Sequence, residues 1–189
     1  SGMVPRVLAS ALVVGGGLIA FIGWLDDRMS VPAGIRFVIQ LGAAWWAIRA
    51  LGVETAQGPI ALSVTMLGVV WMVNLFNFMD GLDGIAATQA ALACTFAAIA
   101  LGFTDNFAAA YCCSVIAAAV GGFLWWNRPP AKIFMGDVGS GTLGFSLAVL
   151  ALASHGASTV GLTGWAFLLA PFIVDATCTL GVRTLRGER

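Results

Sequence analysis

Residues 59–79 read PIALSVTMLGVVWMVNLFNFM, and residues 80–84 read DGLDG. The first stretch is apolar along most of its length, and a helix needs about 20 such residues to span the hydrocarbon core of a bilayer. Polar side chains gather at its end, where Asn74, Asn77, Asp80 and Asp83 follow one another at intervals of three. The stretch therefore predicts a membrane-spanning helix that ends in a polar turn.

The composition of the whole chain agrees with a membrane protein. Of its 189 residues, 60% are hydrophobic and 10% are charged, and the mean hydropathy is +0.96. A soluble domain carries roughly 25% charged residues, so this chain cannot cover a water-facing surface. The net charge of zero gives no indication of a nucleic-acid partner, and we expect none.

Other apolar stretches resemble the first one in length and character. About seven helices are expected, at residues 7–25, 33–51, 59–79, 85–103, 107–126, 139–154 and 160–182. The runs are too long and too uniformly apolar for barrel strands. The predicted fold class is therefore all-α, a polytopic transmembrane helical bundle that forms a single domain over residues 1–189 in the lipid bilayer.

The basic residues indicate how the spans are oriented. One set of connections comprises residues 26–32, 80–84, 127–138 and the C-terminal tail, and it carries Arg28, Arg128, Lys132, Arg183, Arg186 and Arg189. The other set comprises residues 52–58, 104–106 and 155–159, and it contains no lysine or arginine. The positive-inside rule places the first set in the cytoplasm.

The acidic residues follow the same division, although the rule does not require it. The opposite connections hold only Glu54 and Asp105. The cytoplasmic set holds five aspartates: Asp26, Asp27, Asp80, Asp83 and Asp137. This convergence predicts a site at the cytoplasmic membrane face.

The first acidic segment reads GWLDDRMS, residues 23–30. Adjacent carboxylates repel each other, so a metal ion, a cationic partner or a role in handling phosphate would account for Asp26 and Asp27. The alternative is a solvated helix end.

The second segment is the polar end of the opening stretch. Steps of three residues place its four polar side chains near one face of a helix, and Gly81 and Gly84 end that helix. The alternative is a polar cap with turn chemistry. Such a cap does not require Asn74 and Asn77 a turn or two deeper, where polar groups are costly unless they face a cavity or a partner.

The third segment reads WWNRPPAKIFMGDVGSGTLGF, residues 125–145. Pro129 and Pro130 end the incoming helix, and GDVGSG then begins the next one, with exposed N–H groups that suit phosphate oxygens. Asp137 beside them suits Mg²⁺, which one or two protein carboxylates and substrate phosphates usually hold. The G-K-[ST] ending of a Walker motif is absent, and the alternative is a flexible loop.

Several residues outside these segments have more than one possible role. Asp175 lies in the middle of the last span, where a carboxylate is a functional hypothesis. Arg36, about one turn into the second span, either snorkels to the interface or reaches toward a phosphate. His155 falls on the opposite face and is interpreted as a loop residue. The cysteines lack metal-ligand spacing and are interpreted as membrane-buried thiols: Cys94, Cys112, Cys113 and Cys178.

The three segments together resemble the polyprenyl-phosphate N-acetylhexosamine-1-phosphate transferases of glycosyltransferase family 4. The matching stretches are LDD at 25–27, NLFNFMDGLDG at 74–84 and KIFMGDVGSG at 132–141, in that order and on one membrane side. That family includes phospho-N-acetylmuramoyl-pentapeptide translocase and the initiating transferases of O-antigen and teichoic acid linkage units. The chain is most similar to the O-antigen-initiating branch, because the peptidoglycan branch typically has threonine where Met79 stands.

The resemblance implies a reaction and its partners. A UDP-N-acetylhexosamine would donate its sugar-1-phosphate to undecaprenyl phosphate and release UMP, in the bacterial inner membrane and at its cytoplasmic face. The product would initiate a cell-surface polysaccharide, as in lipopolysaccharide or cell-wall biogenesis. The resemblance also leaves room for a homodimer.

The resemblance further implies roles for individual residues. Asp137 would hold Mg²⁺, or Mn²⁺ in its place. Asp26 and Asp27 would handle the lipid phosphate, one of them as a candidate general base. The residues implied to bind the nucleotide-sugar are Asn77, Asp80, Asp83, Asn127 and Phe134, the last by stacking on uracil. The cations that would offset phosphate repulsion are Arg36, Arg128 and Lys132. The candidate catalytic residues are Asp26, Asp27, Asp80 and Asp83.

The resemblance covers nearly the whole chain but only part of the family fold. Family members have further N-terminal spans and a C-terminal histidine-rich cytoplasmic loop, so we expect this chain to be the central part of a larger protein. The identity of the sugar depends partly on that loop.

Three alternatives to this function remain. A membrane transporter also uses intramembrane carboxylates, but near the midplane, where Asp175 alone lies. A CDP-alcohol phosphatidyltransferase requires an alanine-arginine pair soon after its first DG, and DGLDGIAATQA has no arginine. An inactive truncated remnant is the third.

Overall fold

The computed structural model describes residues 5–53, 58–155 and 160–187, and within these ranges it contains helices and no strand. The prediction of an all-α bundle is therefore confirmed. The elements are α1 (Arg6–Ser10), the π-helical turn η1 (Ala11–Gly15), α2 (Gly16–Met29), α3 (Ala33–Leu51), α4 (Gly58–Met79), α5 (Ile85–Gly102), α6 (Phe107–Asn127), α7 (Gly136–Ser154), α8 (Leu162–Leu168) and α9 (Ala170–Arg186).

Most of the expected spans are long and apolar enough to cross a membrane. Among the described residues, five helical runs qualify: Arg6–Met29, Gly58–Met79, Ile85–Gly102, Phe107–Asn127 and Gly136–Ser154. Helices α8 and α9 qualify together as a sixth span, bent by 68°. The remaining expected span, 33–51, is the helix α3, but Arg36, Gln40 and Arg49 lower its hydropathy and it does not qualify. The bundle is thus polytopic with five to six such spans instead of seven.

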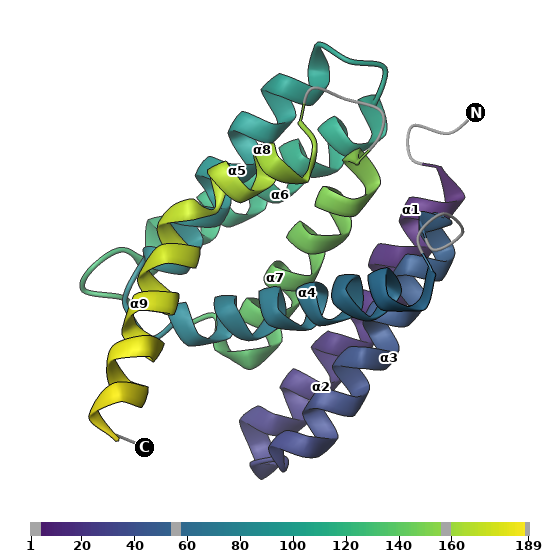
Figure 1. The fold of residues 1–189 in the computed structure, drawn as a ribbon. Helices are drawn as coiled ribbons and strands as arrows, with labels where there is room; N and C mark the ends of the chain where they lie inside the picture. The colour runs from purple at the N-terminus through teal and green to yellow at the C-terminus, as the bar shows by residue number, and fades with distance from the viewer. Residues whose placement is uncertain (1–4, 54–57, 156–159, 188–189) are drawn as a thin grey trace.

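Helix α7 is the centre of the bundle. Helices α2 and α4 pack along it, and α5 and α6 form a hairpin on its other side (Figure 1). In the 18-residue apolar stretch of α7, 61% of the residues are buried inside the bundle, against 17% to 44% in the other four unbent spans. Gly144 permits the close approach of α4, because a Cβ there would lie 2.5 Å from the carbonyl oxygen of Met72.

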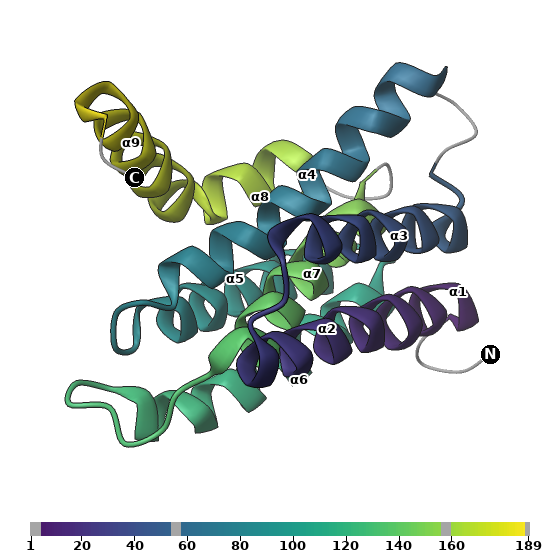
Figure 2. The same cartoon turned by 90° about the horizontal axis from the view of Figure 1, so that it is seen from below.

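The connections between helices lie at two ends of the bundle. In Figure 1 the α2–α3, α4–α5 and α6–α7 connections and the C-terminus lie toward the bottom and left, and the N-terminus and the α5–α6 connection lie toward the upper right. Figure 2 shows the α6–α7 connection and the N-terminus on opposite sides from a second direction. This division agrees with the first predicted set of connections and with 104–106 of the second, whereas residues 54–57, 156–159 and 188–189 lie outside the described residues.

The bend between α8 and α9 is held by contacts to neighbouring helices. Gln89 of α5 donates from Nε2 to the carbonyl oxygen of Leu168 over 2.5 Å. Trp165 of α8 donates from Nε1 to Ser154 Oγ at the end of α7, over 2.8 Å. The Phe172 ring of α9 lies 5.2 Å from that of Phe76 in α4. These contacts place α9 against the end of the bundle that carries the acidic connections.

Candidate active site

Asp26 stands in the last turn of α2 and stabilises the reversal into α3. Helix α2 ends at Met29, and Ser30 then adopts the left-handed conformation with φ 51°. The backbone N–H of Val31 donates to Asp26 Oδ1 over 2.6 Å. One carboxylate oxygen of Asp26 therefore bonds its own loop, and the other is directed to α3.

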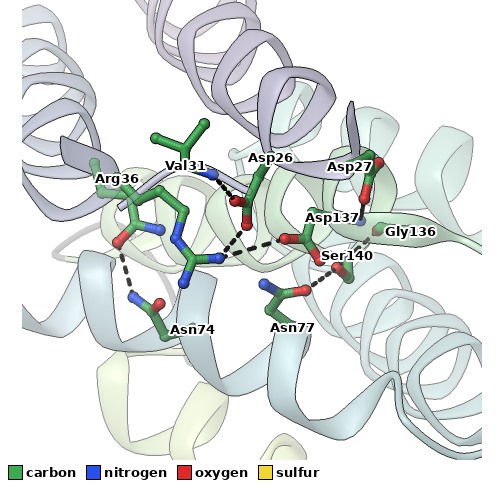
Figure 3. A network of polar contacts seen from close by, with 10 residues as sticks. Asp26, Asp27, Val31, Arg36, Asn74, Asn77, Gly136, Asp137 and Ser140 are labelled. Atoms are coloured by element: carbon green, nitrogen blue, oxygen red, sulfur yellow. Dashed lines mark hydrogen bonds and ion pairs between the residues drawn. The ribbon is translucent and has the colours of Figure 1, made fainter. Parts of the chain in front are cut away.

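Arg36 links two of the predicted carboxylates. It lies in the first turn of α3 and forms an ion pair with Asp26 Oδ2, while the same Nη1 lies 3.5 Å from Asp137 Oδ2 of α7 (Figure 3). The side chain of Asp26 is 11% exposed and that of Arg36 is 33% exposed. Arg36 thus bridges α2 and α7 through its guanidinium group.

Asp27 contacts the first turn of α7. Its Oδ1 accepts a hydrogen bond from the backbone N–H of Asp137 over 3.1 Å. Gly23 makes this approach possible, because a Cβ at that position would lie 2.7 Å from the backbone carbonyl of Asp137. One of the N–H groups expected to receive phosphate is therefore bonded to a carboxylate of the protein itself, where the helix dipole favours negative charge.

Asn77 joins α4 to the same turn of α7. Ser140 Oγ, which is fully buried, lies 2.9 Å from Asn77 Oδ1 and 2.9 Å from the carbonyl oxygen of Gly136. A hydroxyl group has a single hydrogen, so these two acceptors share one donor. Asn77 therefore contacts the glycine-rich start of α7 as well as lying beside Asp137 (Figure 3).

Asp80 lies just beyond the end of α4 and near the same carboxylates. Burial, followed by the negative charge of Asp137, raises its pKa to about 6. A carboxyl group in this state changes its charge close to neutral pH, which makes it sensitive to a cation placed between it and Asp137.

The charge of this cluster fits a divalent cation. Three helix ends bring four carboxylates together, and the cluster contains Asp26, Asp27, Asp80 and Asp137. Only the guanidinium group of Arg36 pairs with them among the described residues. Within the described part of the chain, no group of three or more aspartate, glutamate, histidine or cysteine side chains is placed to hold a metal ion. An oxygen-rich site with one or two usable carboxylates suits Mg²⁺ that also binds substrate phosphates.

Asp83 belongs to a second cluster that fastens two loops together. Its Oδ2 accepts from the backbone N–H of Ala131 over 2.9 Å. Asn127, buried at the end of α6, accepts from the N–H of Gly84 over 3.0 Å and donates to the carbonyl oxygen of Ile133 over 2.9 Å. Both polar ends of the Asn127 amide group thus bond to the backbone, and they hold the 80–84 turn against the loop before α7.

The remaining candidate residues lie around these clusters. Phe134 is 75% exposed, so its ring is open to a stacking partner. Arg128 lies over the ring of Trp125 at 4.1 Å, and Lys132 lies over that of Trp126 at 5.5 Å. These cations are held on aromatic faces at the end of α6, beside the site.

Asp175 is separate from the carboxylate cluster. It lies exposed on α9 and lines a groove of about 850 Å³ with mainly apolar walls, together with Asp83 and Arg128. His155 ends α7 at the opposite end of that helix from Asp137, as predicted. Of the cysteines, Cys94 and Cys113 are buried, whereas Cys178 is exposed on α9.

Sequence reasoning missed two contributors to the site. Ser140 was part of a glycine-rich motif, but its bond to Asn77 depends on the packing of α4 against α7. Gln40 is the second: the sequence shows an amide one turn from Arg36 in an apolar span, which is a recognisable signal, and the structure buries it.

These features define a class of protein: a helical membrane bundle that collects carboxylates and an arginine at one end, in an arrangement suited to phosphate chemistry. The chain belongs to glycosyl transferase family 4, whose model matches residues 9–155. The family resemblance drawn from the three sequence motifs is thereby confirmed.

Curated relatives agree with this assignment. The chain is 35% identical over 164 residues to a probable undecaprenyl-phosphate N-acetylglucosaminyl 1-phosphate transferase of Bacillus subtilis, over 80% of this chain and 46% of that protein. It is 32% identical over 197 residues to a decaprenyl-phosphate N-acetylglucosaminephosphotransferase of Mycolicibacterium smegmatis, over 92% of this chain and 48% of that protein. It is also 32% identical over 180 residues to a phospho-N-acetylmuramoyl-pentapeptide-transferase of Synechococcus elongatus, over 82% and 48% respectively. The chain spans about half the length of these relatives.

Proposed function

We propose that the protein transfers N-acetylhexosamine-1-phosphate from a UDP-sugar to undecaprenyl phosphate and releases UMP, at the cytoplasmic face of a bacterial inner membrane. The membership of glycosyl transferase family 4 supports the reaction class. The names of two relatives favour transfer of an N-acetylglucosaminyl-1-phosphate group and a polyprenyl phosphate acceptor. In this proposal the product initiates a cell-surface polysaccharide such as an O-antigen.

One observation carries the proposal: Arg36 bridges Asp26 and Asp137, while Asp27 bonds the first turn of α7. A water-soluble donor and a lipid acceptor can meet only at the membrane boundary. The cluster lies at the ends of α2, α4 and α7. If these three helices cross a membrane, their ends lie at its surface, and so does the cluster.

The reaction brings two anions together. A phosphate oxygen of the lipid would attack the phosphorus that carries the sugar, and the bond from that phosphorus to the oxygen of UMP would break. Asp137 is the residue that would hold Mg²⁺, or Mn²⁺ in its place, and the bound ion would offset charge on the diphosphate. Arg36 would add a positive charge beside it.

The other residues would bind and orient the two substrates. Asp26 and Asp27 would face the lipid phosphate, and either could accept its proton. Asn77, Asp80 and Asp83 would hold the nucleotide-sugar. Asn127 fixes the two loops on which this half of the site is built, and the exposed ring of Phe134 would stack on uracil.

The apolar groove beside Asp83 supports a lipid acceptor. Its walls include Met79 of α4, Leu124 of α6 and Phe172 of α9, and its charged lining residues are Asp83, Arg128 and Asp175. A prenyl chain could lie along such a surface with its phosphate directed to the helix ends. The transporter alternative requires a site near the midplane, and the carboxylate cluster lies at helix ends instead.

A reconstitution assay tests the proposal. The full-length protein, purified in detergent, is incubated with undecaprenyl phosphate, Mg²⁺ and a panel of UDP-sugars that includes UDP-N-acetylglucosamine and UDP-N-acetylmuramoyl-pentapeptide. We expect UMP release and a lipid-linked sugar product with an N-acetylhexosamine donor. Absence of UMP with every donor, from protein that is folded and monodisperse, would reject the proposed function.

A further inference from the structure

A pair of amide side chains lies one helical turn deeper than the carboxylate cluster. Asn74 of α4 donates from Nδ2 to Gln40 Oε1 of α3 over 2.8 Å, and to the carbonyl oxygen of Val70 over 2.7 Å. Both hydrogens of the Asn74 amide are therefore used, which fixes its orientation. Gln40 is 7% exposed, so its acceptor oxygen would otherwise be buried without this partner.

Gln40 and Asn74 lie one helical turn from Arg36, which contacts Asp137, and from Asn77, which contacts Ser140. On α3, Gln40 follows Arg36 by four residues, and on α4, Asn77 follows Asn74 by three. Residues at these spacings share one face of a helix. The hydrogen bond between Gln40 and Asn74 therefore joins α3 to α4 one helical turn from Arg36 and from Asn77.

A small cavity connects the pair to the cluster. It has a volume of about 20 Å³, and its polar lining consists of Arg36, Gln40, Asn77 and Asp137. This volume accommodates about one water molecule. Gln40 of the amide pair and Asp137 thus line the same water-sized cavity.

The surroundings of Asn74 argue against an incidental contact. The exposed stripe of α4 is otherwise formed by large apolar side chains at helical spacing, namely Ile60, Val64, Leu67, Trp71 and Phe78. A polar group on such a stripe is costly in a membrane unless it has a partner. Gln40 is that partner, and Gln40 belongs to the helix that carries Arg36.

We infer that Gln40 and Asn74 are positioning residues, whose hydrogen bond holds Arg36 between Asp26 and Asp137. The inference rests on the proposed function for its kinetic consequence, since Arg36 and Asp137 act there on the diphosphate. Loss of the bond is expected to displace Arg36 and to slow the chemical step, while donor binding through Asp83 and Phe134 is retained.

Kinetics of the full-length protein test the consequence. Gln40→Leu and Asn74→Ala are each expected to lower kcat for UMP release about tenfold or more, with KM for the UDP-sugar nearly unchanged. The exchanged pair Gln40→Asn with Asn74→Gln keeps both hydrogen-bonding groups and is expected to restore most of kcat. Asn106→Leu is the matched control: Asn106 also joins two helices, by donating to Ala153 at the other end of α7, so its loss should lower Tm but not kcat.

A structural readout separates this inference from the proposed function. In cryo-EM structures of the wild type and of Asn74→Ala, the contact between Arg36 and Asp137 is expected to be present in the first and lost in the second. An unchanged contact overturns the inference, whether or not the protein is a transferase. Equal losses of kcat in Asn74→Ala and Asn106→Leu would overturn it as well, because they would reflect general destabilisation. An inactive wild type in which Asn74→Ala still displaces Arg36 would reject the proposed function alone.

Discussion

Asp27 and Asp137 meet across two helices, although 110 positions separate them in the sequence. The backbone N–H of Asp137 donates to Asp27 Oδ1 over 3.1 Å, and this bond attaches the end of α2 to the start of α7. A carboxylate at a helix N-terminus is favourable, because the helix dipole places partial positive charge there. The bond also fixes the backbone from which the Asp137 side chain reaches toward Arg36.

Asp137→Asn tests the metal-binding role of this carboxylate. In the full-length protein we expect Mg²⁺-dependent UMP release to be abolished while the protein remains folded, because the amide has no negative charge for the ion. UMP release and Tm are measured over a range of Mg²⁺ concentrations. Release at the wild-type rate would contradict the role of Asp137.

Arg36→Met removes the cation between two carboxylates. Asp26 and Asp137 would then repel each other without compensation, and we expect a loss of about 1–3 kcal/mol in stability together with loss of transfer. Thermal unfolding and UMP release provide the measurements. Arg28→Met is the control, because Arg28 lies over the Trp24 ring at 4.5 Å and forms no ion pair within the described residues. Similar losses in both variants would contradict the specific role of Arg36.

Gly23→Ala tests the close approach of α2 to α7. The added methyl group would lie 2.7 Å from the Asp137 backbone, so the helices must separate, at a cost of about 1–3 kcal/mol. We expect a lower Tm and reduced transfer. Gly17→Ala, in the same helix, meets nothing within 4 Å and should retain stability and activity. If the two variants behave alike, helix propensity and not packing explains the result.

The raised pKa of Asp80 predicts that the stability of the protein depends on pH. Its pKa in the folded protein is raised to about 6, from an ordinary value of 3.8. The folded state therefore binds the proton more tightly than the unfolded state, and the Asp80 contribution to the unfolding free energy decreases as pH rises from about 4 to about 6. Asp80→Asn lacks this titration.

Thermal unfolding without Mg²⁺ checks the Asp80 prediction. The Tm of Asp80→Asn minus that of the wild type should be near its minimum at pH 4 and should increase to a plateau above about pH 6. Added Mg²⁺ should move the step to lower pH, since a cation stabilises the charged carboxylate. A Tm difference that is constant over this range would show that Asp80 has an ordinary pKa.

Phe134→Ala tests the proposed stacking on uracil. The exposed ring contributes little to the core, so the Tm should change little, whereas KM for the UDP-sugar should rise by about tenfold. KM for undecaprenyl phosphate should remain near the wild-type value. Phe134→Tyr, which keeps the aromatic face, is the matched control. Equal increases in both KM values would count against stacking.

Much of the fold was predictable from composition and from the length of the apolar runs. The boundaries of α3, α4 and α5 lie within a residue of the expected segments, because glycine, proline and polar turns end these helices. The bend in the last span was not predicted. It depends on Gln89 and Trp165, which contact α8 from other parts of the sequence.

The candidate site was predicted in its members but only partly in its arrangement. The three-residue spacing suggested that Asn74, Asn77, Asp80 and Asp83 act together. In the structure Asn74 bonds Gln40, Asn77 lies against Ser140, and Asp83 bonds the loop before α7. Asn74 and Asn77 share one face of α4 and contact different neighbours one turn apart, whereas Asp80 and Asp83 lie beyond Met79, where α4 ends and the helical periodicity no longer applies.

The sequence by itself determined that the chain is a membrane helical bundle, and it determined which polar segments share one end of it. Apolar length and charge distribution are local properties, and they act through burial in lipid without reference to distant residues. Only the tertiary structure decided that Arg36 lies between Asp26 and Asp137, and that Asp27 bonds the start of α7. Those contacts depend on how closely α2, α3 and α7 pack, which small residues such as Gly23 permit but which no local pattern specifies.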